Sequence, residues 1–369
     1  MLKISMLVVG VGLALIPVIS NSTSLIEMEE KLLEMEEELF ISTEGLYDIN
    51  TRVDSQMTIS GYTDVEFIST SQPGKPDGFR LHHMSLFFEK NMNDKWRFFS
   101  EVEYEDAPKF EGTGKNDPLK ASEGKIFLEA VNMTYFWKQE VNFRFGRMFT
   151  PAGIWSVDHY PTFVPTQNRP QHIRKIFPQN VDGTQVFGTV VVGSGFLSYD
   201  LYVGNGRSAN SGKTDDNSSK SKGAKMSFIF PVLNHFELGT SYYVDPQDSI
   251  KSGEELIATG FHGKIRAGQT TLQFEVANAE WDTTEAEGSY AQLLHDWNKY
   301  TLGVRTDSYD NDSANTATQS EISVNSIFAN YHFNENVTIK IEHHVIDNEN
   351  SAIKDYEKTI VSIVGYLGN

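Results

Sequence analysis

The sequence predicts an all-β protein: a 16-stranded antiparallel transmembrane β-barrel with a short N-terminal coiled-coil helix. From residue 56 onward, segments of about ten residues alternate polar and apolar side chains, which indicates strands with one wet and one apolar face. Short turns alternate with long polar loops between these segments, as in the barrels of bacterial outer membranes. An export-signal pattern at the N-terminus completes the prediction.

Residues 1–20 are expected to form a signal peptide. Lys3 supplies the positive charge, and Met6 to Ile19 form a nearly continuous apolar run. The run has about fourteen residues, within the ~7–15 of a signal and short of the ~20 of a membrane helix. Cleavage is therefore expected near Asn21, and a short membrane anchor is the alternative.

Residues 21–44 are predicted to form a periplasmic coiled-coil helix, followed by a linker over residues 45–55. Apolar residues recur at alternating spacings of three and four, and Glu occupies most other positions. Two heptads are too short to fold alone. We therefore expect a parallel bundle that ties identical subunits into a trimer, or else a helix packed on its own domain. The apolar positions of the heptads are Leu25, Met28, Leu32, Met35 and Leu39.

Residues 56–369 are predicted to form the barrel, with about sixteen strands. Turns such as NMND, KQE and VGSG alternate with loops such as APKFEGTGKNDPLKAS and RSANSGKTDDNSSKS. A soluble sandwich or solenoid would also alternate, but it would not need this regular change of connection length. Sixteen strands can enclose an aqueous channel. The strands are expected to begin near Gln56, Gly78, Lys95, Gly124, Gln139, Asp182, Gly195, Lys222, His235, Glu254, Gln269, Glu287, Lys299, Glu321, Asn336 and Lys358.

Residues of about 149–180 form a long loop that is predicted to constrict the pore. Five of the twelve prolines lie in Met148–Gln179, and proline stiffens its own residue and the one before it. Cations in a narrow passage outweigh a distant net charge, because the Debye length is about 8 Å at physiological salt. The alternative is that these cations pair with carboxylates of the wall. The predicted constriction residues are Arg147, His159, Arg169, His172, Arg174 and Lys175.

Strand alternation also predicts side chains that face the lumen. The cations of this wall are expected to be Arg144, Lys225, Lys264, Arg266, Arg305 and Lys340. The inward acids are expected to be Asp64, Glu66, Glu101, Glu103, Glu275 and Glu342. This predicts a lumen of mixed charge rather than a uniformly basic one.

Composition excludes several function classes. The chain has no cysteine, which removes disulfides, thiolate metal sites and cysteine nucleophiles. A net charge of -19 argues against a nucleic-acid partner. An outer-membrane lipase or protease is an alternative, but no G-x-S-x-G motif orders the serines with His82–His83 or His343–His344. An adhesin or anchor is a further alternative. No cofactor and no metal site are predicted, and the runs DDNSS and DNDS are interpreted as solvated loops.

Two motifs resemble a known family. GRMFTPAG (Gly146–Gly153) followed by DGTQVFG (Asp182–Gly188) resembles the phosphate-selective porin superfamily, and the N-terminal heptads resemble its DcaP-like trimeric outer-membrane porins. The resemblance implies a homotrimer of sixteen-stranded barrels with an inward-folded third loop. The chain lacks the dense series of inward Arg and Lys that phosphate selectivity implies.

The predicted function is passive diffusion of small hydrophilic solutes, with a preference for anions such as phosphate or organic acids. The predicted location is the bacterial outer membrane, where the barrel would contact lipid and lipopolysaccharide.

Overall fold

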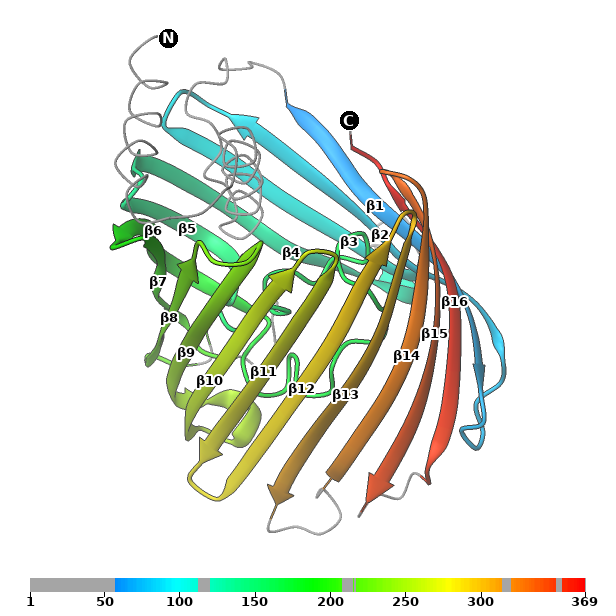
Figure 1. Cartoon of the computed structure of the whole chain (residues 1–369). Coiled ribbons are helices and arrows are strands. Elements are labelled where there is room, and N and C mark those ends of the chain that lie inside the picture. Colours follow the sequence, from blue (N-terminus) through cyan, green and yellow to red (C-terminus); the bar gives the residue numbers. More distant parts are fainter. Residues whose placement is uncertain are drawn as a thin grey trace.

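Sixteen antiparallel strands form a closed barrel, in which each strand pairs with its sequence neighbours and β1 pairs with β16 (Figure 1). The computed structural model describes residues 57–111, 120–207, 215, 217–313, 320–349 and 354–368. The predicted signal peptide, coiled coil and linker lie outside these residues. Among the described residues, no helix is long and apolar enough to span a membrane.

The predicted strands are confirmed, and the largest error in a strand start is at β4, which begins at Lys120 instead of Gly124. The strands are β1 (Thr58–Thr70), β2 (Gly78–Asn91), β3 (Trp96–Glu111), β4 (Lys120–Lys138), β5 (Val141–Phe149), β6 (Asn180–Val192), β7 (Gly195–Asn205), β8 (Lys220–Phe230), β9 (His235–Asp248), β10 (Glu254–Ala267), β11 (Thr270–Trp281), β12 (Thr284–Trp297), β13 (Tyr300–Ser313), β14 (Ser320–Asn334), β15 (Val337–Glu349) and β16 (Tyr356–Tyr366). A short 3-10 helix, η2 (Ser249–Lys251), follows β9.

The two ends of the barrel differ in the length of their connections. At the end where β1 begins, tight turns join β4 to β5, β6 to β7 and β10 to β11. Tight hairpins need residues that tolerate positive φ, and Gly193, Gly268 and Asn298 have φ of 62°, 60° and 53°. The opposite end carries the long connections, including residues 150–179 between β5 and β6. The predicted alternation of short and long connections is therefore confirmed except at the β11–β12 connection, residues 282–283, which is as short as the turns of the other end.

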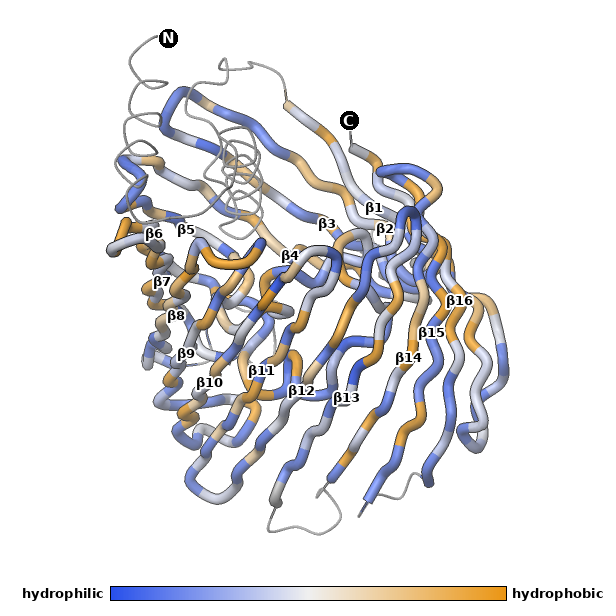
Figure 2. The backbone as a smooth tube through the Cα atoms, in the orientation of Figure 1, coloured by the Kyte–Doolittle hydropathy of each residue, from blue (hydrophilic) through white to orange (hydrophobic). Residues whose placement is uncertain are grey.

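Many apolar side chains of the strands are exposed, and the hydropathy of the strands alternates along the chain (Figure 2). On β15, Ile341 and Val345 are exposed, whereas Lys340, Glu342 and His344 between and beside them are buried. Side chains of a strand alternate between its two faces, so the charged residues line the lumen. Aromatic rings cluster on the outer face at the short-turn end. The ring centroids are 5.0 Å apart for Trp96 and Tyr135, and 5.1 Å apart for Tyr300 and Tyr331. Such rings are typical of a membrane interface.

The apolar core of the protein lies inside the barrel, where the β5–β6 connection packs on the wall. One buried cluster joins Ile176 and Phe177 of this connection to strands β7 and β9–β13, and a second joins Trp155, Val164 and Ile173 to Tyr290 of β12. Three alanines of the wall, Ala258, Ala279 and Ala286, belong to the first cluster. Their small side chains let the connection approach the wall closely.

Candidate functional site

The candidate site is the β5–β6 connection, residues 150–179, which we call the lumen loop. It contains no helix or strand and lies within the ring of strands (Figure 1). A chain without secondary structure must satisfy its backbone N–H and C=O groups in another way. The lumen loop does so partly with turns of its own, such as Val164 N–H to the Tyr160 carbonyl oxygen at 2.9 Å, and partly with charged side chains of the wall.

Wall carboxylates accept hydrogen bonds from backbone N–H groups of the lumen loop. The two oxygens of the Glu342 carboxylate each accept one such bond, one from the N–H of Gln167 and the other from the N–H of Asn168. Hydrogen bonds to a charged acceptor contribute about 1.5–3 kcal/mol each. These bonds therefore fix the middle of the loop to β11, β13 and β15. The N–H to carboxylate distances are 3.0 Å for Trp155 to Glu275, 2.7 Å for Gln167 to Glu342, 3.1 Å for Asn168 to Glu342 and 3.0 Å for Gln171 to Asp307.

Three predicted wall cations donate to backbone carbonyl groups of the loop. Lys225 Nζ lies 2.7 Å from the carbonyl oxygen of Gly153. Arg305 Nη2 lies 2.7 Å from the carbonyl oxygen of Asn168, and Lys340 Nζ donates to the carbonyl groups of Pro161 and Val164. These cations face the lumen by strand alternation, and the structure places their charged groups on the loop rather than in open water.

For the other three wall cations, the described contacts are with the wall and with an adjacent turn. Arg144 on β5 donates to the side chains of Thr134 and Gln185, at 3.3 and 3.0 Å. Arg266 donates to the carbonyl oxygen of Gly268 in the adjacent turn, at 3.3 Å. Lys264 is half-buried on β10, opposite Glu237 of β9.

Arg169, Arg174 and Lys175 carry the positive charge of the lumen loop. All three are half-buried, and none lies within 4.0 Å of a carboxylate of the described residues. Lys175 Nζ instead lies 4.2 Å from the centre of the Tyr309 ring and donates to Gln171 Oε1. Burial lowers the pKa of Arg169 to about 10 and the pKa of Lys175 to about 8. Both side chains are therefore mostly charged at pH 7.

His159 and His172, predicted to line the constriction, are packing residues of the loop. Their side chains are 3% and 2% exposed. The His159 ring packs edge-on against Phe149, with centroids 4.5 Å apart, and the His172 ring stacks on Tyr290. Burial lowers the pKa of both imidazoles, so they add no positive charge at pH 7.

Arg147 is also placed differently from the prediction. It lies on β5, opposite Val131 of β4 and Asp182 of β6. Its guanidinium binds the Asp182 carboxylate with two bonds of 2.6 and 2.7 Å, and donates to the carbonyl oxygen of Leu128. Since Arg144 points inward, alternation points residue 147 outward. Arg147 is therefore on the outer surface, apart from the lumen loop.

An acidic wall faces Arg169 and Arg174, and sequence reading found only part of it. Glu101 and Glu103 of β3 are buried, and Tyr160 of the loop donates to Glu101 at 3.0 Å. Glu129 of β4 is 5% exposed and was not predicted to face inward. The register of β3 and β4 shifts at this point: Glu101 pairs with Ala130, whereas the next residue, Val102, pairs with Leu128. Glu129 is left without a partner residue, and this bulge turns its side chain inward.

A polar cavity lies beside the lumen loop, against strands β5–β9. Its lining includes Arg144, Lys225 and Glu237 of the wall and Pro151 and Val157 of the loop. The lumen therefore retains space with charged groups of both signs next to the loop.

No protein-family model matches the chain. A curated relative, an uncharacterized protein of Aquifex aeolicus, is 24% identical over 279 residues, which cover 72% of this chain and 59% of the relative's length. The chain therefore spans less than two thirds of that relative.

Several solved structures have the same fold. The outer membrane channel DcaP of Acinetobacter baumannii aligns at 10% identity with a TM-score of 0.58, over 86% of this chain and 99% of that chain. Salmonella typhi OmpF, in a complex with daunomycin, aligns at 14% identity with a TM-score of 0.61, over 85% and 98% of the two chains. The trimer form of OmpT, an outer membrane protein of Vibrio cholerae, aligns at 12% identity with a TM-score of 0.53, over 84% and 99%. These likenesses show that the chain has a porin-like barrel fold.

Proposed function

We propose that this protein is an outer-membrane porin through which small hydrophilic solutes diffuse passively, with a preference for anions such as phosphate or organic acids. The lumen loop forms the constriction. The observation that carries the proposal is the state of Arg169, Arg174 and Lys175, which lie in the loop without a carboxylate partner among the described residues. By contrast, the wall cations Arg305 and Lys340 donate hydrogen bonds to backbone carbonyl groups of the loop.

The outer surface supports the membrane location. Exposed Val304, Ile341 and Ile363 belong to an apolar outer face that lipid would cover. Aromatic rings at the short-turn end suit contact with the headgroup region of lipid and lipopolysaccharide. A barrel of sixteen strands is wide enough for water in its lumen.

Electrostatics supports the preference for anions. A unit charge 4 Å from a passing ion contributes about 1 kcal/mol even in bulk water, which changes the local ion concentration roughly fivefold. Charges more than a Debye length away contribute little at physiological salt. The three loop cations therefore influence solutes in the passage more than the acidic outer loops do.

We also propose that three copies assemble. The trimer form of OmpT from Vibrio cholerae shares the barrel fold. The heptads of residues 25–39, which lie outside the described residues, provide a second contact between subunits if they form a parallel bundle.

The test replaces Arg169, Arg174 and Lys175 together with Ser and measures reversal potentials across a salt gradient in planar bilayers. The ratio of anion to cation permeability is expected to fall roughly fivefold or more. Arg147→Ser is the matched control, because it removes a cation that lies on the outer surface. A triple variant that keeps the wild-type reversal potential would show that the loop cations have only a structural role.

One side-chain arrangement bears on the alternative of a barrel enzyme. His344 contacts Ser326 Oγ at 2.7 Å through Nδ1 and Glu342 at 2.8 Å through Nε2. A hydroxyl, an imidazole and a carboxylate in this order occur in hydrolases. All three residues are at most 2% exposed, and the lumen loop occupies Glu342. We therefore assign them a structural role. Hydrolysis of ester or peptide substrates by the wild type that is lost in Ser326→Ala would refute this assignment.

A further inference from the structure

A β-bulge turns two consecutive histidines of β2 toward the lumen. Asp64 of β1 pairs with His83, the next residue Val65 pairs with Leu81, and His82 is left without a partner. A bulge of this kind places two residues of one strand opposite one residue of its neighbour. Leu81 and Met84 on either side are 42% and 40% exposed, whereas His83 is 4% exposed. Both imidazoles therefore lie on the inner side of the barrel.

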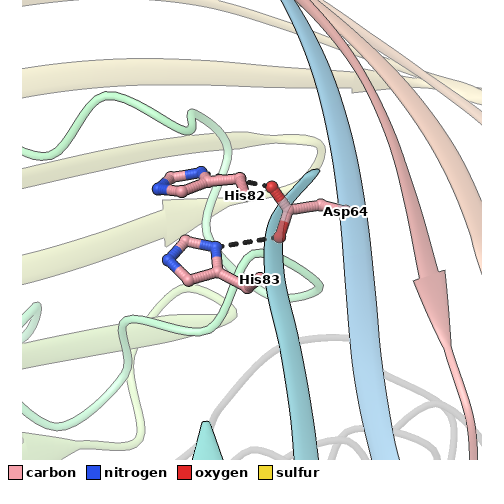
Figure 3. A group of neighbouring side chains, drawn as sticks. All are labelled: Asp64, His82 and His83. Carbon is pink, nitrogen blue, oxygen red and sulfur yellow. Dashed lines mark hydrogen bonds and ion pairs between the residues drawn. The ribbon is translucent and has the colours of Figure 1, made fainter. Parts of the chain in front are cut away.

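The two imidazoles converge on the carboxylate of Asp64 (Figure 3). His83 Nδ1 lies 2.8 Å from Asp64 Oδ1, and His82 Nδ1 lies 3.3 Å from Asp64 Oδ2. The ring centroids are 3.5 Å apart. One donor atom from each of the three residues lies within 4.8 Å of the others. In tetrahedral zinc sites, bonds of about 2.0–2.1 Å place the ligand atoms roughly 3.3 Å apart. Small side-chain rotations thus suffice to close the three donors around one ion.

Further carboxylates surround this trio. Glu66 Oε1 lies 2.8 Å from His82 Nδ1, and Glu105 Oε1 lies 3.8 Å from the second ring nitrogen of His83. Metal-binding histidines commonly have a carboxylate at their other nitrogen, which orients the ring. Glu105 has this place at His83, whereas Glu66 lies at the same His82 nitrogen that faces Asp64. Asp64 and Glu103 are 0% and 1% exposed; Asp64 Oδ2 has only His82 Nδ1, at 3.3 Å, as a neighbouring N–H group, and Glu103 Oε1 has no hydrogen-bond donor among the described protein groups. Buried carboxylate oxygens without a donor favour a positive ligand.

We propose that Asp64, His82 and His83 bind one divalent transition-metal ion of the zinc class within the lumen. Imidazole and carboxylate donors suit Zn²⁺, Ni²⁺ or Cu²⁺, whereas Ca²⁺ and Mg²⁺ prefer sites built of oxygen alone. His82 retains 15% side-chain exposure and provides the entry side. The site was not predicted from sequence and does not depend on solute diffusion through the barrel. A bound ion would add two positive charges to the acidic wall that faces the lumen loop.

The chain contains its own comparison for this geometry. His343 and His344 on β15 are also consecutive, but the register of β15 with β16 is regular there. His343 consequently contacts Thr359 with 38% of its side chain exposed, whereas His344 is buried at the opposite face. The same dipeptide thus forms no paired site without a bulge.

The test measures Zn²⁺ binding to the detergent-solubilised full-length protein, purified without a polyhistidine tag. Equilibrium dialysis and metal analysis give the stoichiometry and the affinity. We expect one ion per chain in the wild type, and at least about tenfold weaker binding in His82→Gln and in His83→Gln, because even orienting partners of a ligand contribute 10–100-fold. His343→Gln is the matched control and should bind as the wild type does. Gln retains a hydrogen-bonding group next to Asp64, and heat-modifiable migration checks that each variant has folded.

A measurement on the unaltered protein covers the case in which a variant does not fold. Co²⁺ added to the wild type should give visible absorption bands that Zn²⁺ abolishes. The absence of these bands at millimolar Co²⁺ would overturn the proposal. Equal zinc affinity in the wild type and in a folded His82→Gln or His83→Gln variant would also overturn it. A blocked or anion-indifferent pore would refute the proposed function but leave these binding results unaffected.

Discussion

Glu342→Gln is expected to loosen the lumen loop while leaving the barrel closed. The Glu342 carboxylate accepts the N–H groups of Gln167 and Asn168 at 2.7 and 3.1 Å. The amide of Gln keeps one acceptor oxygen and puts an N–H₂ donor in the place of the other. One loop N–H then loses a charge-assisted bond, which contributes about 1.5–3 kcal/mol. This raises the population of the displaced loop by roughly 10- to 150-fold.

The assay uses the absence of cysteine in the natural chain. Val164→Cys introduces a single thiol of similar size at a loop position that is 8% exposed and packs near Trp155. The rate of maleimide labelling then reports how often the loop opens. Labelling should accelerate by about tenfold or more when Glu342→Gln is added. Glu280→Gln on the exposed face of β11 is the control and should leave the rate unchanged. A rise of less than roughly threefold in Glu342→Gln would mean that these bonds do not hold the loop.

Three other perturbations test separate parts of the structure. The anion preference should fall between pH 7 and pH 9, because Lys175 with a pKa of about 8 loses its charge as pH rises, and the fall should be smaller in Lys175→Arg, whose guanidinium keeps its charge. Gly153→Ala should lower the urea midpoint of unfolding more than Gly193→Ala does: both glycines have positive φ, but only at Gly153 would a Cβ lie 1.8 Å from Glu275 Oε2. Equal effects of the two would show that only backbone strain matters. Deletion of residues 25–40 should lower the stability of the trimer in native mass spectrometry without abolishing conductance, and a trimer of unchanged stability would remove that role for the heptads.

Strand number, strand position and the lengths of most connections follow from the sequence, because they depend on local patterns; the two-residue β11–β12 connection is the exception. Alternation of polar and apolar residues is a property of each segment, and it placed every strand start within four residues of the observed one. The same alternation points Arg305 and Lys340 inward. It also points Arg147 outward, so its prediction as a constriction residue was wrong on grounds that the sequence already contained.

Tertiary structure alone decided where the bulges lie and what the lumen loop contacts. A bulge is set by the register of two strands, and neither His82 nor Glu129 carries a local pattern that reveals one. Lys340 and the loop carbonyl of Pro161 are 179 positions apart in the chain. Closing the barrel brings such groups together, and the buried polar groups of an irregular loop then take whichever charged partners the wall presents. The residue types of the lumen were therefore readable from the chain, whereas their pairing followed from closure of the barrel around the loop.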